Sequence, residues 1–92
     1  MNRLSIPGFQ HAIKALYGAN STFERRVRVL EEHDGEAVWH GDVLVFRLLD
    51  HPRSPFCYAW EEEGEVTAIL HDDVVQSAAD AVRAALGSTQ ID

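Results

Sequence analysis

The chain has 92 residues, a length that supports a single domain over residues 1–92 with one modest core. Its apolar fraction of 46% and charged fraction of 25% are typical of globular proteins. The formal net charge of −7 is opposite to that of proteins that bind a nucleic-acid backbone, so we expect no nucleic-acid partner. The sequence has no apolar run of about 20 residues and no secretion signal, and its single cysteine allows no internal disulfide. We therefore expect a cytoplasmic protein without a membrane partner.

Two amphipathic segments near the ends of the chain predict helices. In the first, apolar side chains recur at helical spacing from Phe9 to Tyr17, with Pro7 suited to the first turn and Gly18 to the left-handed position after the last. A second apolar stripe predicts a helix through Ala78 to Leu86 that ends at the following glycine. We expect residues 88–92 to form a disordered tail.

The segment between the helices predicts strands separated by tight turns and by one loop that contains two prolines. Asp34-Gly35 and Glu63-Gly64 are the expected turn centres. A two-residue turn at Asp34-Gly35 would place Leu30 opposite Trp39, and Gly41 marks either a bulge or a close approach of the backbone. The strands are expected at residues 23–32, 38–49, 56–61 and 65–71.

The expected order of elements is therefore α-β-β-β-β-α. Short connections make consecutive strands neighbours in space, which predicts a four-stranded antiparallel meander. With the N- and C-terminal helices both on one side of this sheet, the expected fold class is α+β, a two-layer sandwich.

The second strand is apolar on both sides, because Val43 and Val45 alternate with Leu44 and Phe46. A sheet that meets water on one face would alternate apolar and polar residues, so both faces of this sheet need a cover. Small side chains such as Cys57 let a helix approach closely. We expect the helices on the face that carries these small side chains.

Aromatic side chains gather on the other face, where we expect a subunit interface or the wall of a ligand pocket. A homodimer is the expected assembly, with a protein or a small molecule as a further partner. Cover by the chain's own helices is the third alternative. The residues expected on this face are Phe46, Phe56, Tyr58, Trp60, Ile69 and, if a bulge corrects its phase, Trp39.

A second group of polar residues lies where two strands end. In a meander the second and fourth strands end at the same edge, so histidines and carboxylates from two loops can meet there, beside a cysteine. Such a set could hold a divalent metal, form an acid/base pair or supply a thiol nucleophile. The spacing matches no metal or hydrolase motif, and these residue types are common in turns and caps, so we assign no catalytic residue, metal or cofactor. The candidates are Asp50, His51, Cys57, His71, Asp72 and Asp73.

The segments Val38–Phe46, His51-Pro52 and Cys57–Trp60 resemble small uncharacterised bacterial proteins, some of which are carried on mobile gene cassettes. The resemblance covers about half of the chain. It implies no activity, cofactor or catalytic residue.

These observations favour a small, non-enzymatic, homodimeric binding protein that uses its aromatic face. One alternative is a small metal-dependent or acid/base enzyme that uses the residues at the strand ends. Another is an acidic inhibitor of a nucleic-acid-binding partner, which would need a continuous stripe of carboxylates.

Overall fold

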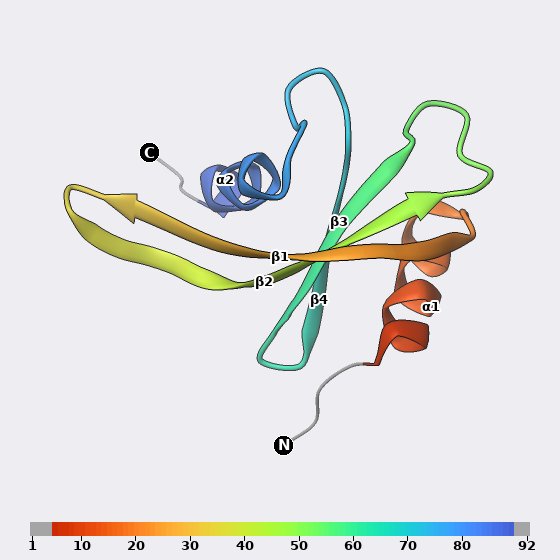
Figure 1. Ribbon diagram of the computed structural model, residues 1–92, viewed down its shortest axis with the longest axis horizontal. Coiled ribbons are helices and arrows are strands. Elements are labelled where there is room, and N and C mark those ends of the chain that lie inside the picture. Colours follow the sequence, from red (N-terminus) through yellow and green to blue (C-terminus); the bar gives the residue numbers. More distant parts are fainter. Residues whose placement is uncertain (1–4, 90–92) are drawn as a thin grey trace.

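The computed structural model describes residues 5–89 and confirms the expected order of elements. The strands follow the order β1-β2-β3-β4 in one antiparallel sheet, so the predicted meander and the α+β class are confirmed. Figure 1 shows the long β1–β2 hairpin crossing the shorter β3–β4 hairpin, with a helix near each end of the molecule. The elements are α1 (Ile6–Tyr17), β1 (Ser21–His33), β2 (Glu36–Leu48), β3 (Phe56–Glu62), β4 (Glu65–Leu70) and α2 (Ala78–Thr89).

The ends of α1 follow the local chemistry of the sequence. The Ser5 hydroxyl accepts the N–H of Gly8 at 3.3 Å, and Pro7 lies in the first turn. Gly18 adopts the left-handed conformation with φ 71° and donates its N–H to the carbonyl of Lys14. The predicted start and end of this helix are therefore confirmed.

The end of α2 differs from the expectation. The helix continues through Gly87 to Thr89, so the predicted end at Gly87 is wrong. Glycine is tolerated inside a helix at a cost of about 1 kcal/mol, and it ends a helix only where the backbone turns left-handed. The part of the predicted tail at residues 90–92 lies outside the described residues.

Both predicted hairpin turns are confirmed by their backbone angles. Asp34 and Gly35 have φ of 54° and 81°, and Glu63 and Gly64 have φ of 51° and 83°. Two successive positive φ values are the signature of the type I′ turn, whose twist matches that of the flanking strands.

The register of the first hairpin differs from the prediction by one residue. Leu30 pairs with His40, not with Trp39, because Val38 is an extra residue opposite the step from Glu31 to Glu32. Of the two alternatives predicted for Gly41, a bulge or a close approach of the backbone, the bulge does not form. Gly41 instead provides a close approach, since a Cβ there would lie 3.1 Å from Cη2 of the Trp39 ring.

Each face of the sheet is covered by a different helix, so the expectation that both helices share one side is wrong. Leu44 and Phe46 pack with α1 in one buried cluster, whereas Val43 and Val45 pack with α2 in another. Strand β2 directs apolar side chains to both faces of the sheet. If both helices packed on the same face, the apolar side chains on the other face would be exposed. The need for cover that the sequence indicates is therefore met within one chain.

The aromatic residues do not all share one face. Phe46 pairs with Cys57 in the sheet register and is buried on the α1 side, where its ring lies 6.1 Å from that of Phe9. Tyr58 and Trp60 do lie on the opposite face, but α2 buries them. Cover by the chain's own helix, the third alternative above, is what the structure shows for these two residues.

Long-range hydrogen bonds tie each helix to a strand that is distant in sequence. The hydroxyl of Tyr17 in α1 donates to the carbonyl of Ala68 in β4, and Arg83 in α2 pairs with Glu31 in β1. No helix among residues 5–89 is long and apolar enough to cross a membrane.

Candidate functional site

The histidine in the loop after β2 stabilises its own loop. Nδ1 of His51 accepts the backbone N–H groups of Arg53 at 3.1 Å and Ser54 at 3.0 Å. Two backbone donors on one ring nitrogen hold the loop closed, as an Asx turn does with a carboxylate. The ring of His51 therefore has a structural role that explains its position.

Two of the three carboxylates of the strand-end group accept backbone N–H groups. Asp50 accepts the backbone N–H of Asn20 at 2.8 Å and its side-chain amide at 2.9 Å. Asp72 accepts the N–H of Val74 and of Val75, and these hydrogen bonds lower the pKa of its carboxyl below 3.8. The side chain of Asp73 is exposed. Asp50 and Asp72 therefore bind different segments of the backbone and do not share a site.

His71 and Tyr58 form the closest side-chain pair at this edge. Nδ1 of His71 lies 2.8 Å from the Tyr58 hydroxyl. The centroid of the His71 ring is 5.9 Å from that of Phe56, in an edge-to-face arrangement. The carbonyl of His71 accepts the hydroxyl of Ser54 at 2.6 Å, which links the two loops through the backbone. Burial raises the pKa of Tyr58, so its hydroxyl stays protonated and serves as a hydrogen-bond partner.

Cys57 lies on the opposite face of the sheet from Tyr58, inside the cluster covered by α1. Its side chain is fully buried, and burial raises the pKa of the thiol to about 12. A neutral, inaccessible thiol is a poor nucleophile. Among residues 5–89, no three His, Cys, Asp or Glu side chains are placed to hold a metal ion together.

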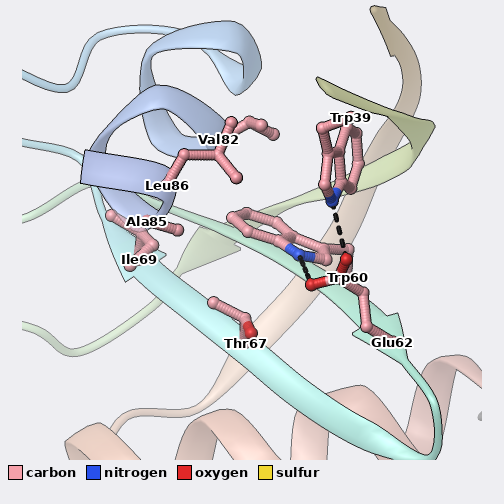
Figure 2. Close-up of a pocket in the computed structure, with 8 residues that line it drawn as sticks. All are labelled: Trp39, Trp60, Glu62, Thr67, Ile69, Val82, Ala85 and Leu86. Atoms are coloured by element: carbon pink, nitrogen blue, oxygen red, sulfur yellow. Dashed lines mark hydrogen bonds between the residues drawn. The ribbon is translucent and has the colours of Figure 1, made fainter. Parts of the chain in front are cut away.

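The structure gathers part of the aromatic set in a different place, a groove between the second half of α2 and the sheet (Figure 2). The groove has a volume of about 310 Å³, which is at the small end of the range for ligand sites. We call it the indole groove. It is lined by Trp39, Trp60, Glu62, Thr67, Ile69, Val82, Ala85 and Leu86.

A single carboxylate orients both tryptophans of the indole groove. Nε1 of Trp39 donates to Oε2 of Glu62 at 2.8 Å, and Nε1 of Trp60 donates to Oε1 at 3.3 Å. Figure 2 shows both indole N–H groups directed at this carboxylate. The centroids of the Trp39 and Trp60 rings are 5.7 Å apart and the ring planes meet at 68°, an edge-to-face arrangement that aromatic pairs favour. Trp60 is 2% exposed and forms the floor, whereas Trp39 is half-buried and forms a wall.

Trp39 reaches this face by simple alternation along β2. Residues 39, 41, 43 and 45 share a side, and Val45 pairs with Tyr58 on the face that α2 covers. No bulge is needed to correct the phase of Trp39, because Phe46 is the residue that lies on the other face. The missing side chain at Gly41 leaves room for the indole.

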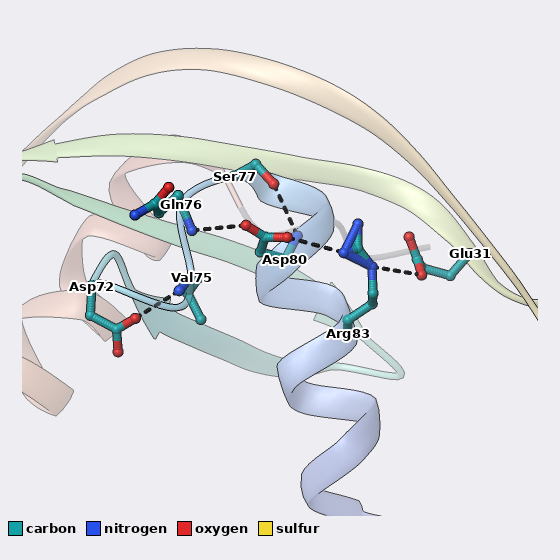
Figure 3. A network of polar contacts seen from close by, with 7 residues as sticks. All are labelled: Glu31, Asp72, Val75, Gln76, Ser77, Asp80 and Arg83. Atoms are coloured by element: carbon teal, nitrogen blue, oxygen red, sulfur yellow. Dashed lines mark hydrogen bonds and ion pairs between the residues drawn. The ribbon is translucent and has the colours of Figure 1, made fainter.

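A polar network fixes the start of α2, and with it the helical wall of the groove (Figure 3). Arg83 donates to Glu31 at 3.1 Å and to Asp80 at 3.0 Å, which joins α2 to β1. The Ser77 hydroxyl accepts the N–H of Asp80, and the Asp80 carboxylate accepts the N–H of Gln76. Exposed ion pairs contribute only about 0–1 kcal/mol, so this network orients the helix more than it stabilises it.

Sequence reasoning identified three of the groove residues, Trp39, Trp60 and Ile69, but not Glu62. The signal for Glu62 was its alternation with Trp60, which places both side chains on one face of β3. Comparisons of the chain with protein-family models, curated proteins and solved structures gave no match. The resemblance to small bacterial proteins therefore stays a prediction.

Proposed function

We propose that the chain is a non-enzymatic binding protein and that the indole groove is its ligand site. The observation that carries this proposal is the composition of the groove, in which two indoles donate to one oriented carboxylate and apolar side chains of α2 form the opposite wall. Ligand sites are typically concave and apolar, with a few polar groups that fix the ligand's orientation. The predicted role of the aromatic face as a ligand wall is thus limited to the part that α2 leaves open.

The placement of the titratable groups supports binding over catalysis. Within the described part of the chain, Glu62 is the one titratable residue that lines the indole groove, so these residues form no acid/base pair there. Two of the strand-end residues, His51 and Asp72, bind backbone groups of their own loops, and Asp50 binds Asn20. The alternative of a metal-dependent or acid/base enzyme has the part-buried pair of His71 and Tyr58 in its favour, but no three metal-ligating side chains lie together among residues 5–89.

The distribution of charge also gives little support to an acidic inhibitor. Several carboxylates outside the β3–β4 turn lie in ion pairs, including Glu24 with Arg47, Asp42 with Arg28 and Glu31 with Arg83. These arginines interrupt the stripe of carboxylates that such an inhibitor would need. A cytoplasmic location remains a prediction from the sequence.

The groove is tested by filling it. Ala85→Phe places a ring in the groove, whereas Ala84→Phe adds the same ring at an exposed position next to it on α2. The two indole N–H resonances in an NMR spectrum report on the site, because both tryptophans of the chain line it. We expect small apolar probes to shift these resonances saturably in the wild type and in Ala84→Phe, but not in Ala85→Phe. No shift in the wild type, or an equal response in both variants, would contradict the proposal.

We also propose that two copies associate, with the outer edge of β1 as the contact. This strand has thirteen residues and, among residues 5–89, a hydrogen-bonded neighbouring strand on one side only. Leu30, which is 57% exposed, lies in its second half. Antiparallel pairing of two β1 strands centred on Val29 would place Arg26 opposite Glu32 of the second copy, so the edge is complementary to itself in charge.

A charge swap tests this assembly. Arg26→Glu should dissociate the dimer, since it places like charges opposite each other, and Arg26→Glu combined with Glu32→Arg should restore it. Light scattering after size-exclusion chromatography gives the mass of each variant. A monomeric wild type at micromolar concentration would rule out this contact.

A further inference from the structure

We infer that the indole groove selects an organic ammonium cation, a positively charged nitrogen that carries apolar substituents. This inference rests on the proposed function, because it names the chemical class of the groove's ligand. The ammonium group would lie against the accessible face of the Trp39 ring, beside the Glu62 carboxylate, and the apolar substituents would face Val82 and Leu86 on the opposite wall.

The arrangement of the indoles leaves negative potential in the groove. Each indole directs its N–H, the positive edge of the ring, at the Glu62 carboxylate. The faces of aromatic rings are the negative part of their charge distribution and attract cations. Trp39, as the half-buried wall, offers the accessible ring. Contact of a cation with one such exposed ring typically strengthens binding about two- to fivefold.

The charge of Glu62 adds to this potential. Its side chain is exposed, and each of its oxygens accepts one indole N–H, which leaves part of the roughly four lone-pair positions of a carboxylate for a ligand. Glu65 pairs with Glu62 across the hairpin, and Glu63 lies in the turn between them. Among residues 5–89, no Lys, Arg or His lines the groove.

The cationic side chain that α2 places near the groove is Arg83, and it is already paired with two carboxylates. Arg83 binds Glu31 and Asp80, and it lies outside the set of residues that line the groove. The net charge of −7 attracts cations to the protein as a whole. Local and overall charge therefore favour a cationic ligand over an anionic one.

Two other ligand classes fit the groove less well. A neutral apolar ligand would cover the Glu62 carboxylate without replacing its lost water, which costs free energy. A metal ion would find one carboxylate and the hydroxyl of Thr67, too few ligands for a divalent cation. An organic ammonium ion satisfies the carboxylate and buries its substituents at the same time.

Three probes of similar size that share a trimethyl group and differ in charge separate this inference from the proposed function. Choline, 3,3-dimethylbutan-1-ol and 3,3-dimethylbutanoate are titrated against the full chain, with the indole N–H resonances as the readout. We expect choline to bind about tenfold more tightly than the alcohol, and the anion to bind most weakly. If the alcohol binds as tightly as choline, the ammonium preference is wrong and the groove remains a ligand site. If none of the three shifts the resonances, both proposals fail.

Variants identify the source of the preference. Glu62→Gln keeps an acceptor for an indole N–H but removes the charge, and Glu63→Gln removes one charge from the same hairpin outside the groove. We expect Glu62→Gln to lower choline affinity about fivefold and to leave the alcohol unaffected, with little change in Glu63→Gln. Trp39→Leu should reduce the choline preference while keeping an apolar wall, which gives a second test if Glu62→Gln is poorly folded. Equal loss of choline binding in both glutamine variants would overturn the inference.

Discussion

The separate cover of the two sheet faces predicts that truncations on the two helices destabilise the protein independently. Ile13 in α1 and Val82 in α2 are both fully buried, and they belong to different clusters on opposite faces of the sheet. We expect Ile13→Ala and Val82→Ala each to lower the free energy of unfolding. In the double variant the two losses should add, because the residues share no contact.

The expected losses follow from the atoms removed. Ile13→Ala deletes three carbon atoms, about 2.4 kcal/mol at about 0.8 kcal/mol per buried methylene, and the cavity raises this to roughly 3–4 kcal/mol. Val82→Ala deletes two carbon atoms, which gives roughly 2–3 kcal/mol on the same basis. A domain of this size has a total stability of about 5–14 kcal/mol, so a combined loss of about 5–7 kcal/mol would remove a third or more of it, and all of it at the lower end of the range.

Urea unfolding followed by far-ultraviolet circular dichroism measures these free energies, and tryptophan emission reports separately on the α2 face that buries Trp60. Lys14→Ala, an exposed change on α1, should alter stability by no more than about 0.5 kcal/mol and serves as the control. A negligible loss for Val82→Ala would show that α2 does not cover the sheet. A double variant as stable as Ile13→Ala alone would show the same.

Three further predictions concern single sites. Because the pKa of Cys57 is raised to about 12, the folded thiol should resist thiol reagents at about pH 8 and react only in denaturant, and rapid labelling of the folded chain would contradict this. The contribution of the neutral thiol to stability should hold below its ordinary pKa of 9.0 and be lost as the pH rises toward 12, which a comparison of alkaline unfolding in the wild type and Cys57→Ala measures. Gly41→Val should displace the Trp39 indole, since even a Cβ would lie 3.1 Å from it, and the tryptophan emission should move to longer wavelength; an unchanged spectrum would count against the close approach. Asp72→Ala should lower the thermal midpoint at about pH 7, because two backbone N–H groups lose their acceptor. Since the pKa of Asp72 is lowered, the difference from the wild type should vanish as the pH falls below 3.8, and a difference that persists in acid would show that the ionised carboxylate is not its cause.

Local features of the fold could be predicted because the residues that form them are neighbours in sequence. Asp34-Gly35 and Glu63-Gly64 specify their turns through the backbone angles that these residues tolerate. Pro7 and Gly18 mark the ends of α1 for the same reason. The pattern of β2 also indicated correctly that both sheet faces are covered.

The side on which α2 packs could not be predicted, because an apolar helical stripe shows that one side is buried but not which sheet face buries it. The small residues of β3 and β4 indicated a helix on their face, and α1 occupies it. The face of Phe46 depends on how the loop at residues 49–55 sets β2 against β3, and no local signal fixes that register. The indole groove combines residues from three strands and α2, so only its strand residues could be anticipated.

The crossed attachment of the helices has a consequence for how the chain folds. Each β-strand pairs with its neighbour in sequence, so both hairpins can close over short loops at low entropic cost. The hydrogen bond from Tyr17 to Ala68 instead joins two residues separated by 51 positions in the sequence, and the ion pair from Arg83 to Glu31 joins two separated by 52. Each helix therefore finds its full binding surface only after a distant hairpin has formed, and docking of the two helices should be the last step of folding.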